Sequence, residues 1–371
     1  MLKTRYIMVG GFLGAGKTTA ILRAAQRFQT RGLRVGLITN DQSHGLVDTA
    51  MLASHGFPTE EISGGCFCCR FNNLIEASER LDESTQPDLF LAEPVGSCTD
   101  LVATVVYPLK KIYGERYTPA PLSVLVDPIR VQRVLGLLPG KTFSPKVNYI
   151  YDRQLAEADL IVVNKIDLLE PHDRQRLDET LRRHYPHAQV IMISARTGEG
   201  FEAWLEAIEA GSAAAGEAMD VDYDTYADGE ALLGWLNMTI ELHGNDFDGN
   251  RFLLDFLTDL KQRLQPAGGD EAISIAHLKA TLTPDQGNDL AVANLVREDS
   301  SVEQAYRLVE PLSRGILLLN LRAEEAPERM QAIAHSSLQA VADAHRLQHT
   351  VRHQEAFRPS RPTPTHRFAV G

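Results

Sequence analysis

Short apolar runs alternate with amphipathic stretches along the first 210 residues of the chain. The apolar runs predict buried strands at Tyr6–Val9, Arg34–Thr39, Pro87–Ala92, Leu122–Asp127, Leu160–Asn164 and Val190–Ile193. The stretches Thr19–Gln29 and Asn72–Leu81 have the spacing of helices with one apolar face. Strands that alternate with helices predict an α/β fold with a doubly wound, mostly parallel sheet, which binds ligands at the carboxyl ends of its strands.

The pattern changes after residue 210. Residues 211–220 are small and polar, as in a linker. Beyond them we expect strands near Leu232–Leu242, Ile273–Leu282, Leu290–Val296 and Gly315–Leu321, and helices near Arg251–Leu264 and Pro327–His349. This order predicts a smaller C-terminal α+β domain, in which one antiparallel sheet carries helices on one face.

The domain organisation follows from these patterns. We expect a first domain at residues 1–210, a linker at 211–220, an α+β domain at 221–350 and a disordered tail at 351–371. The tail prediction rests on Pro359, Pro362 and Pro364, which alternate with arginines.

Three histidines, His345, His349 and His353, recur every four residues near this tail. On a helix, neighbouring pairs would lie on one face and could chelate a metal. We favour a solvated helix end instead, because no carboxylate or cysteine accompanies them.

Composition and charge narrow the class of protein. A chain of 371 residues has room for two domains, and its net charge of −12 argues against a general nucleic-acid or anionic-membrane binder. No apolar run approaches the length that a bilayer requires. The first strand begins within about five residues of the start, too early for a signal peptide to precede it. We therefore expect a cytoplasmic protein.

A glycine-rich turn follows the first predicted strand. Residues Gly11–Thr18 match G-x-x-x-x-G-K-[ST], between a strand and a helix, which is the context that this motif requires. Lys17 is expected to reach the β- and γ-phosphates of a nucleotide, and the Thr18 hydroxyl to hold Mg²⁺. Backbone N–H groups of the turn and the helix start would surround the phosphates, with contributions from Gly11, Gly14, Ala15, Gly16 and Thr19.

Acidic residues at strand ends are candidates for the chemistry at the phosphates. Glu93 ends the third strand, where a Walker-B-type acid contacts Mg²⁺ directly or through water, and the Gly96 N–H can reach the γ-phosphate. Asp41 and Asp48 follow the second strand and are candidates for water positioning or Mg²⁺ contact. A surface turn capped by these aspartates is an equally good interpretation.

The fifth strand ends in an N-K-x-D sequence, Asn164–Asp167. The Asp167 carboxylate can accept both hydrogens of guanine N1 and N2, whereas adenine would leave it unpaired. The Lys165 stem can lie over the base while Asn164 ties this loop to the phosphate loop. Backbone N–H groups at Ser194 and Ala195 are placed to face guanine O6. The sequence therefore predicts GTP as the nucleotide.

Three of the four cysteines, Cys66, Cys68 and Cys69, lie within four residues and just before a predicted helix. Such thiolates have lowered pKa values and suit a thiophilic cation. A tetrahedral structural site needs a fourth ligand, which a carboxylate, a histidine, water, a second subunit or a client would have to supply. This favours a transfer site over a permanent one, with an inert thiol cluster as the alternative. Cys98 is expected to have a separate structural role.

Four motifs together resemble one family, the CobW-type P-loop GTPases, which are related to the GTPases that mature urease and hydrogenase. They are Gly11–Thr18, the C-x-C-C of Cys66–Cys69, Glu93–Gly96 and Asn164–Asp167, in the order of the family. The resemblance implies a GTPase whose nucleotide-driven conformational change loads, inserts or withholds Zn²⁺, Co²⁺ or Ni²⁺, with the three cysteines as ligands. One departure is the Asp-Gln-Ser-His-Gly sequence at residues 41–45, where many members have a Glu-Phe-Gly-like sequence.

Two hypotheses follow. The first is a GTP-hydrolysing metallochaperone that cycles between GTP and GDP, slow without a partner, and delivers metal to a client metalloprotein or cofactor-assembly enzyme. A nucleotide-dependent homodimer is an open expectation. The second is a GTP-switched docking module for a metallo- or corrinoid enzyme, in which the cysteines are structural or redox-active. A small-molecule kinase is disfavoured because it has no use for Asp167 or the C-x-C-C motif.

Overall fold

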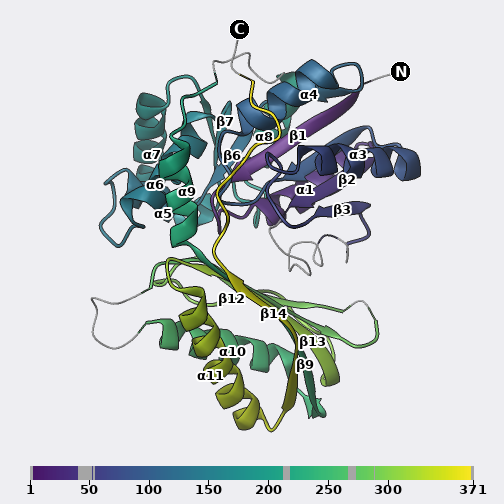
Figure 1. Ribbon diagram of the computed structural model, residues 1–371, viewed down its shortest axis with the longest axis vertical. Coiled ribbons are helices and arrows are strands. Elements are labelled where there is room, and N and C mark those ends of the chain that lie inside the picture. Colours follow the sequence, from purple (N-terminus) through teal and green to yellow (C-terminus); the bar gives the residue numbers. More distant parts are fainter. Residues whose placement is uncertain are drawn as a thin grey trace. The chain divides into compact units, whose positions relative to one another are not determined.

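The chain folds into two compact units. The computed structural model describes residues 3–40, 52, 55–211, 218–265, 273–287 and 289–368 (Figure 1). The first unit consists of Met1–His44, His55–Gly229 and Arg361–Gly371, and the second of Gly45–Ser54 and Glu230–Ser360. The first unit thus continues past the expected linker at 211–220 and also includes the last residues of the chain. Among the described helices, none combines the length and the apolar character that crossing a membrane requires.

A parallel sheet forms the centre of the first unit. Its strands lie in the order β3 (Thr59–Ile62), β2 (Val35–Asn40), β4 (Leu89–Glu93), β1 (Thr4–Gly11), β6 (Ser123–Val126), β7 (Leu160–Val163) and β8 (Gln189–Met192), and β5 (Tyr117–Pro119) also pairs with β1. Strand β7, Leu-Ile-Val-Val, is buried at every position, as expected for a sheet covered on both faces.

Helices cover both faces of this sheet. They are α1 (Lys17–Thr30), α3 (Phe71–Thr85), α4 (Tyr107–Ile112), α5 (Pro128–Val134), α6 (Pro145–Ala156), α7 (Pro171–His184), α8 (Phe201–Ala210) and α9 (Tyr223–Leu232), with short turns η1 (Val102–Val106) and η2 (Ile166–Leu168). The α1 connection runs from β1 toward the β3 edge, whereas the α7 connection runs from β7 toward β8. Because such crossovers are right-handed, the two helices lie on opposite faces. The predicted doubly wound α/β fold is confirmed.

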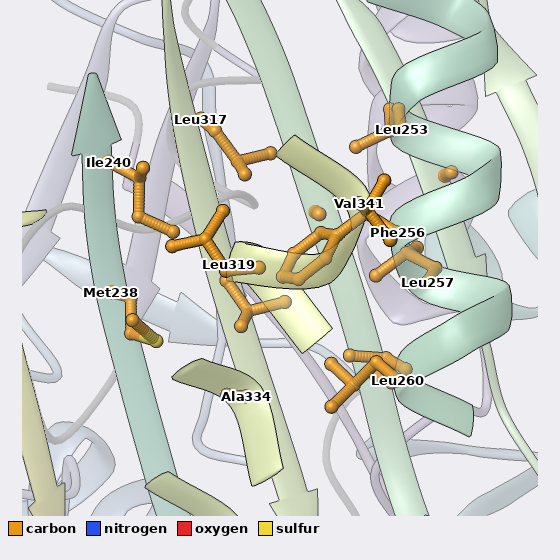
Figure 2. Packing of buried hydrophobic residues seen from close by; sticks show 14 of the residues in the cluster. Met238, Ile240, Leu253, Phe256, Leu257, Leu260, Leu317, Leu319, Ala334 and Val341 are labelled. Carbon is orange, nitrogen blue, oxygen red and sulfur yellow. The ribbon is translucent and has the colours of Figure 1, made fainter. Parts of the chain in front are cut away.

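The described residues of the second unit form an antiparallel sheet and helices that pack on it. The sheet order is β12 (Glu303–Tyr306), β11 (Ala291–Leu295), β10 (Ile275–Pro284), β13 (Leu312–Ala323), β9 (Gly234–Phe247) and β14 (Gln348–Phe357), and the helices are α10 (Gly249–Leu264) and α11 (Pro327–His345). Figure 2 shows Ile240 of β9 and Leu319 of β13 in the same apolar cluster as Phe256 of α10. Alternate residues of β9, β11 and β13 enter this core. The predicted α+β domain is confirmed.

The end of the second unit differs from the prediction in two ways. Helix α11 ends at His345, because Arg346 adopts a left-handed conformation (φ 56°), and His349 and His353 lie in β14. The three histidines therefore share no helix face, and His345 pairs with Asp255 at 3.0 Å.

The expectation of a disordered tail from residue 351 is also wrong, since β14 continues to Phe357 along the edge of the sheet beside β9. Backbone hydrogen bonds make this pairing, so it requires no apolar run in the sequence.

A carboxylate at the end of α6 is surrounded by protein. Glu157 accepts hydrogen bonds from the Thr99 hydroxyl and the Val102 N–H, both at 3.1 Å. Burial raises the pKa of Glu157 to about 8. Between the unfolded pKa of about 4.3 and this value, the folded chain keeps a proton that the unfolded chain has lost. The stability that this proton contributes is complete at low pH and is lost as the pH rises toward 8.

We therefore expect Glu157→Gln to flatten the pH dependence of stability. In the wild type this group lowers the free energy of unfolding by up to about 1.4 kcal/mol per pH unit between pH 5 and 8. Urea unfolding of both proteins at pH 5, 6.5 and 8 measures the difference, with the exposed Glu76→Gln as the charge-matched control. Parallel pH profiles for wild type and Glu157→Gln would contradict the assignment.

Candidate functional site

The turn between β1 and α1 has a conformation that only glycine allows. Gly11, Gly14 and Gly16 have φ values of 123°, 78° and 89°. A Cβ atom at Gly11 would lie 2.2 Å from the Leu125 carbonyl oxygen, and one at Gly16 would lie 2.5 Å from Nδ2 of Asn164. The glycines thus let the turn approach the end of β6 and the loop after β7, where a nucleotide would bind.

Lys17, Thr18 and Glu93 come together at the end of this turn. The Lys17 Nζ donates to the Gly11 carbonyl at 2.9 Å and lies 3.9 Å from Oε1 of Glu93. The Thr18 hydroxyl donates to the same Glu93 oxygen at 3.2 Å. A hydroxyl and a carboxylate are hard oxygen donors, the chemistry that Mg²⁺ requires, so these two side chains fit a magnesium ion.

The loop after β4 packs directly on the phosphate-binding turn. A Cβ atom at Gly96 would lie 2.8 Å from the side chain of Leu13, so only glycine fits there. The Gly96 carbonyl accepts a hydrogen bond from Gln154 at 3.0 Å. This loop is therefore positioned to respond to what the turn binds.

The N-K-x-D residues reach the same turn from β7. Asn164 donates to the Ala15 carbonyl at 3.0 Å, which is the link that we expected of it. Lys165 donates to the Gly14 carbonyl at 2.7 Å and to Asp127 at 2.9 Å. Two side chains of one loop thus hold successive carbonyls of the glycine-rich turn.

Asp167 lies beside the loop after β8. Its Oδ1 accepts a hydrogen bond from the Ser194 hydroxyl at 2.7 Å. The Ala195 N–H, which we expected to face guanine O6, donates to Oδ1 of Asn164 at 2.9 Å instead. These hydrogen bonds join the loops that follow β7 and β8.

Two residues that the sequence reasoning did not single out also support the turn. Asp127 caps α5 by accepting from the N–H groups of Ile129 and Arg130 at 3.1 and 3.0 Å. Arg130 donates to the Leu13 carbonyl at 3.1 Å and lies over the Phe12 ring. An aspartate at a strand end followed by Pro128 is the sequence signal of this cap.

The thiols of Cys66, Cys68 and Cys69 form a cluster. The Cys66 sulfur lies 2.9 Å from that of Cys68 and 3.2 Å from that of Cys69. Cys66 and Cys68 are buried, whereas Cys69 is partly exposed. The neighbouring thiols lower the pKa of Cys66 by hydrogen bonding to its sulfur, and the same contact raises the pKa of Cys68. The cluster has the spacing and the sulfur chemistry of a soft-metal site.

Cys98 belongs to this neighbourhood, so the expectation that it stands apart is wrong. Its thiol is buried and acts on the pKa values of Cys66 and Cys68, which it lowers and raises respectively, after the larger effects of the clustered thiols themselves. Cys98 lies two residues after Gly96 in the loop that follows β4, and β4 is the neighbour of β2. The signal in the sequence was its position just past a strand end, at the edge of the sheet where the other loops meet.

Asn40 connects the end of β2 to the cysteine loop. Its side-chain amide donates to the carbonyls of Ile62 and Gly65 at 2.9 and 2.7 Å. Its Oδ1 accepts from the Phe67 N–H at 2.8 Å, inside the C-x-C-C motif. One side chain thus holds both sides of the turn that carries Cys66. The candidate carboxylates Asp41 and Asp48 lie outside the described residues.

The first half of the chain matches a known protein family. The model of the CobW/HypB/UreG nucleotide-binding domain matches residues 5–192. The chain belongs to this family. It is 30% identical over 194 residues to the zinc chaperone YeiR of Escherichia coli, covering 51% of this chain and 54% of that protein. It is 27% identical over 217 residues to the zinc chaperone CobW of a Sinorhizobium species, covering 52% and 59%.

A third relative has a higher sequence identity over a shorter segment. The hydrogenase maturation factor HypB of Cupriavidus necator is 48% identical over 75 residues, covering 19% of this chain and 20% of that protein. The chain therefore spans about half the length of YeiR or CobW and a fifth of this HypB. The shared part of the family is the nucleotide-binding domain.

Proposed function

We propose that this chain is a GTP-binding and GTP-hydrolysing metallochaperone that couples its nucleotide state to the binding and delivery of a transition metal. The observation that carries the proposal is how the cysteine cluster is held. Asn40 holds it from the end of β2, and Cys98 contacts it from the loop that follows Glu93. Both attachments come from strand ends beside the phosphate-binding turn, so a rearrangement there would reach the thiols.

The nucleotide site would work as follows. Asp167 selects guanine, and Lys17 with the N–H groups of the turn binds the phosphates. Thr18 and Glu93 would hold Mg²⁺, which supplies positive charge to the β- and γ-phosphates. Glu93 and Gly96 would sense the γ-phosphate. We expect slow hydrolysis by the chain alone, with a client or a second copy of the chain accelerating it.

The cargo site would consist of thiolates. Cys66, Cys68 and Cys69 would supply three ligands, and a carboxylate, a histidine, water, a second subunit or a client would supply the fourth. Such soft ligands suit Zn²⁺, Co²⁺ and Ni²⁺. Two relatives are named zinc chaperones, which makes Zn²⁺ the first cargo to test. The client would be a metalloprotein or a cofactor-assembly enzyme.

Cobalt titration of anaerobically purified protein tests the cargo site. Bound Co²⁺ is expected to give a near-ultraviolet thiolate-to-metal absorption band, whose intensity grows with the number of thiolate ligands. If the three clustered thiolates bind the metal, Cys69→Ser should lower this intensity by about one third. Cys98→Ser, a change at a buried thiol outside the cluster, is the matched control.

A variant that lacks all three clustered thiols separates the metallochaperone from the docking module. Metal binding that persists without this band in a Cys66→Ser, Cys68→Ser, Cys69→Ser variant would contradict the cargo site. GTP-dependent capture of a client by that same variant would favour the docking module, in which the cysteines are structural or redox-active.

A further inference from the structure

Residues 361–368 lie along the cysteine loop, although they are far from it in sequence. They belong to the first compact unit and form the end of the yellow trace in Figure 1. The Thr365 N–H donates to the Cys68 carbonyl at 2.8 Å, and its hydroxyl donates to the Cys69 carbonyl at 3.1 Å. The Thr363 N–H donates to the Cys69 sulfur at 3.2 Å. We call residues 361–368 the C-terminal strap.

An ion pair with a buried carboxylate anchors the strap. Arg367 donates to Asp100 at 2.7 Å, and only 1% of the Asp100 side chain is exposed. Asp100 also accepts from the Tyr223 hydroxyl at 2.7 Å. Removing the partner of a buried carboxylate is costly, so the position of Arg367 is strongly specified. Asp100 lies two residues after Cys98, so the strap contacts both loops of the thiol cluster.

Ring contacts and a backbone hydrogen bond extend this interface. His366 packs edge-on against Phe71, the first residue of α3, at 5.2 Å between ring centroids. Phe368 stacks on His366, and the Lys111 ammonium lies 5.0 Å from the Phe368 ring centroid. The Phe368 N–H donates to the Ala103 carbonyl at 2.9 Å. The strap is thus fixed at both ends, with Thr363 over Cys69 and Phe368 beside η1.

We propose that the C-terminal strap is the outer shell of the cargo site and retains the metal there until the strap is displaced. The inference rests on the proposed metallochaperone function. Cys69 is the most exposed of the three clustered thiols, so it faces the route by which a metal would leave. A hydrogen bond from the Thr363 N–H stabilises negative charge on that sulfur and fixes its direction. Partners of this kind commonly change metal affinity by about 10- to 100-fold.

A proline substitution tests this hydrogen bond alone. Thr363→Pro removes the N–H group, and the residue already lies between Pro362 and Pro364, so an extended backbone is retained. Thr363→Ala is the matched control because it keeps the N–H. Full-length protein with GDP and Mg²⁺ is loaded with Zn²⁺ and mixed with a chromophoric chelator, and the rate of metal transfer is measured.

We expect Thr363→Pro to release Zn²⁺ about 10-fold faster than Thr363→Ala, the lower end of that range. In Co²⁺-loaded protein its charge-transfer band should move to lower energy, because the Cys69 sulfur becomes more electron-rich. A chain that ends at Ser360 should show the same two changes, as should Arg367→Gln, which removes the anchoring cation. Nucleotide affinity, measured for each variant, identifies those whose first unit is intact.

Failure of the role of the strap and failure of the metallochaperone function would give different results. Release rates and band energies equal to those of the wild type in the intact variants would overturn the role of the strap and leave the cargo site standing. A wild-type protein whose metal binding does not depend on its cysteines would overturn the proposed function itself.

Discussion

Replacing Asp167 by asparagine is expected to weaken GTP binding by about 10²- to 10³-fold and to create affinity for xanthosine triphosphate. The carboxylate would accept two hydrogens from guanine, and hydrogen bonds to a charged group contribute about 1.5–3 kcal/mol each. Asparagine offers one acceptor and places an N–H donor opposite the guanine amino group. Xanthine has a carbonyl there, so the same donor becomes favourable. A loss of roughly 3–4 kcal/mol corresponds to that range of affinities.

Fluorescence titration with labelled GTP, ATP and xanthosine triphosphate measures this change. Ser194→Ala is the control, because it removes the hydroxyl that donates to Asp167 at 2.7 Å and leaves the carboxylate in place. It should reduce GTP affinity far less than the asparagine variant does. Equal affinities of the wild type for GTP and ATP, or an asparagine variant that binds GTP normally, would contradict the assignment of Asp167.

Local sequence patterns were sufficient to predict those parts of the fold whose conformation depends on local geometry. The glycines at positions 11, 14 and 16 are needed for positive φ, and buried runs such as Leu160–Val163 are typical of a parallel strand covered on both faces. The doubly wound sheet and the arrangement of Lys17 beside Glu93 could therefore be predicted.

Features that depend on contacts between distant segments could not be predicted in this way. Strand β14 has no apolar face of its own and forms by backbone pairing with β9. The strap has a proline-rich sequence typical of disorder, and its conformation comes from docking on Asp100 and Cys69. Cys98 is separated from Cys66 by 32 positions of sequence, and only the neighbouring positions of their loops bring the thiols together.

Nucleotide and metal affinities should be coupled by about tenfold, and Asn40→Ala should remove most of the coupling. Asn40 is buried at the end of β2 and makes its hydrogen bonds to the cysteine loop on both sides of Cys66. Its neighbour Thr39 pairs with Glu93 of β4 in the sheet. A shift at Glu93 would therefore reach the thiols through the adjacent end of β2 and Asn40. Alanine would leave both strands in place and remove the connection to the loop.

The size of this coupling follows from linkage. A coupling free energy of about 1–3 kcal/mol corresponds to a change in affinity of about 5- to 150-fold, and each ligand must change the affinity of the other by the same factor. Because of this reciprocity, the Zn²⁺ titration and the nucleotide titration must give the same coupling factor.

The most direct test is therefore the affinity of the cysteine site for Zn²⁺, measured by chelator competition with the protein saturated either with a non-hydrolysable GTP analogue or with GDP. We expect the two affinities to differ by about tenfold, Zn²⁺ to change the preference for the analogue over GDP by the same factor, and Asn40→Ala to bring both ratios close to one. Equal Zn²⁺ affinities in the two nucleotide states of the wild-type protein would contradict the proposed coupling.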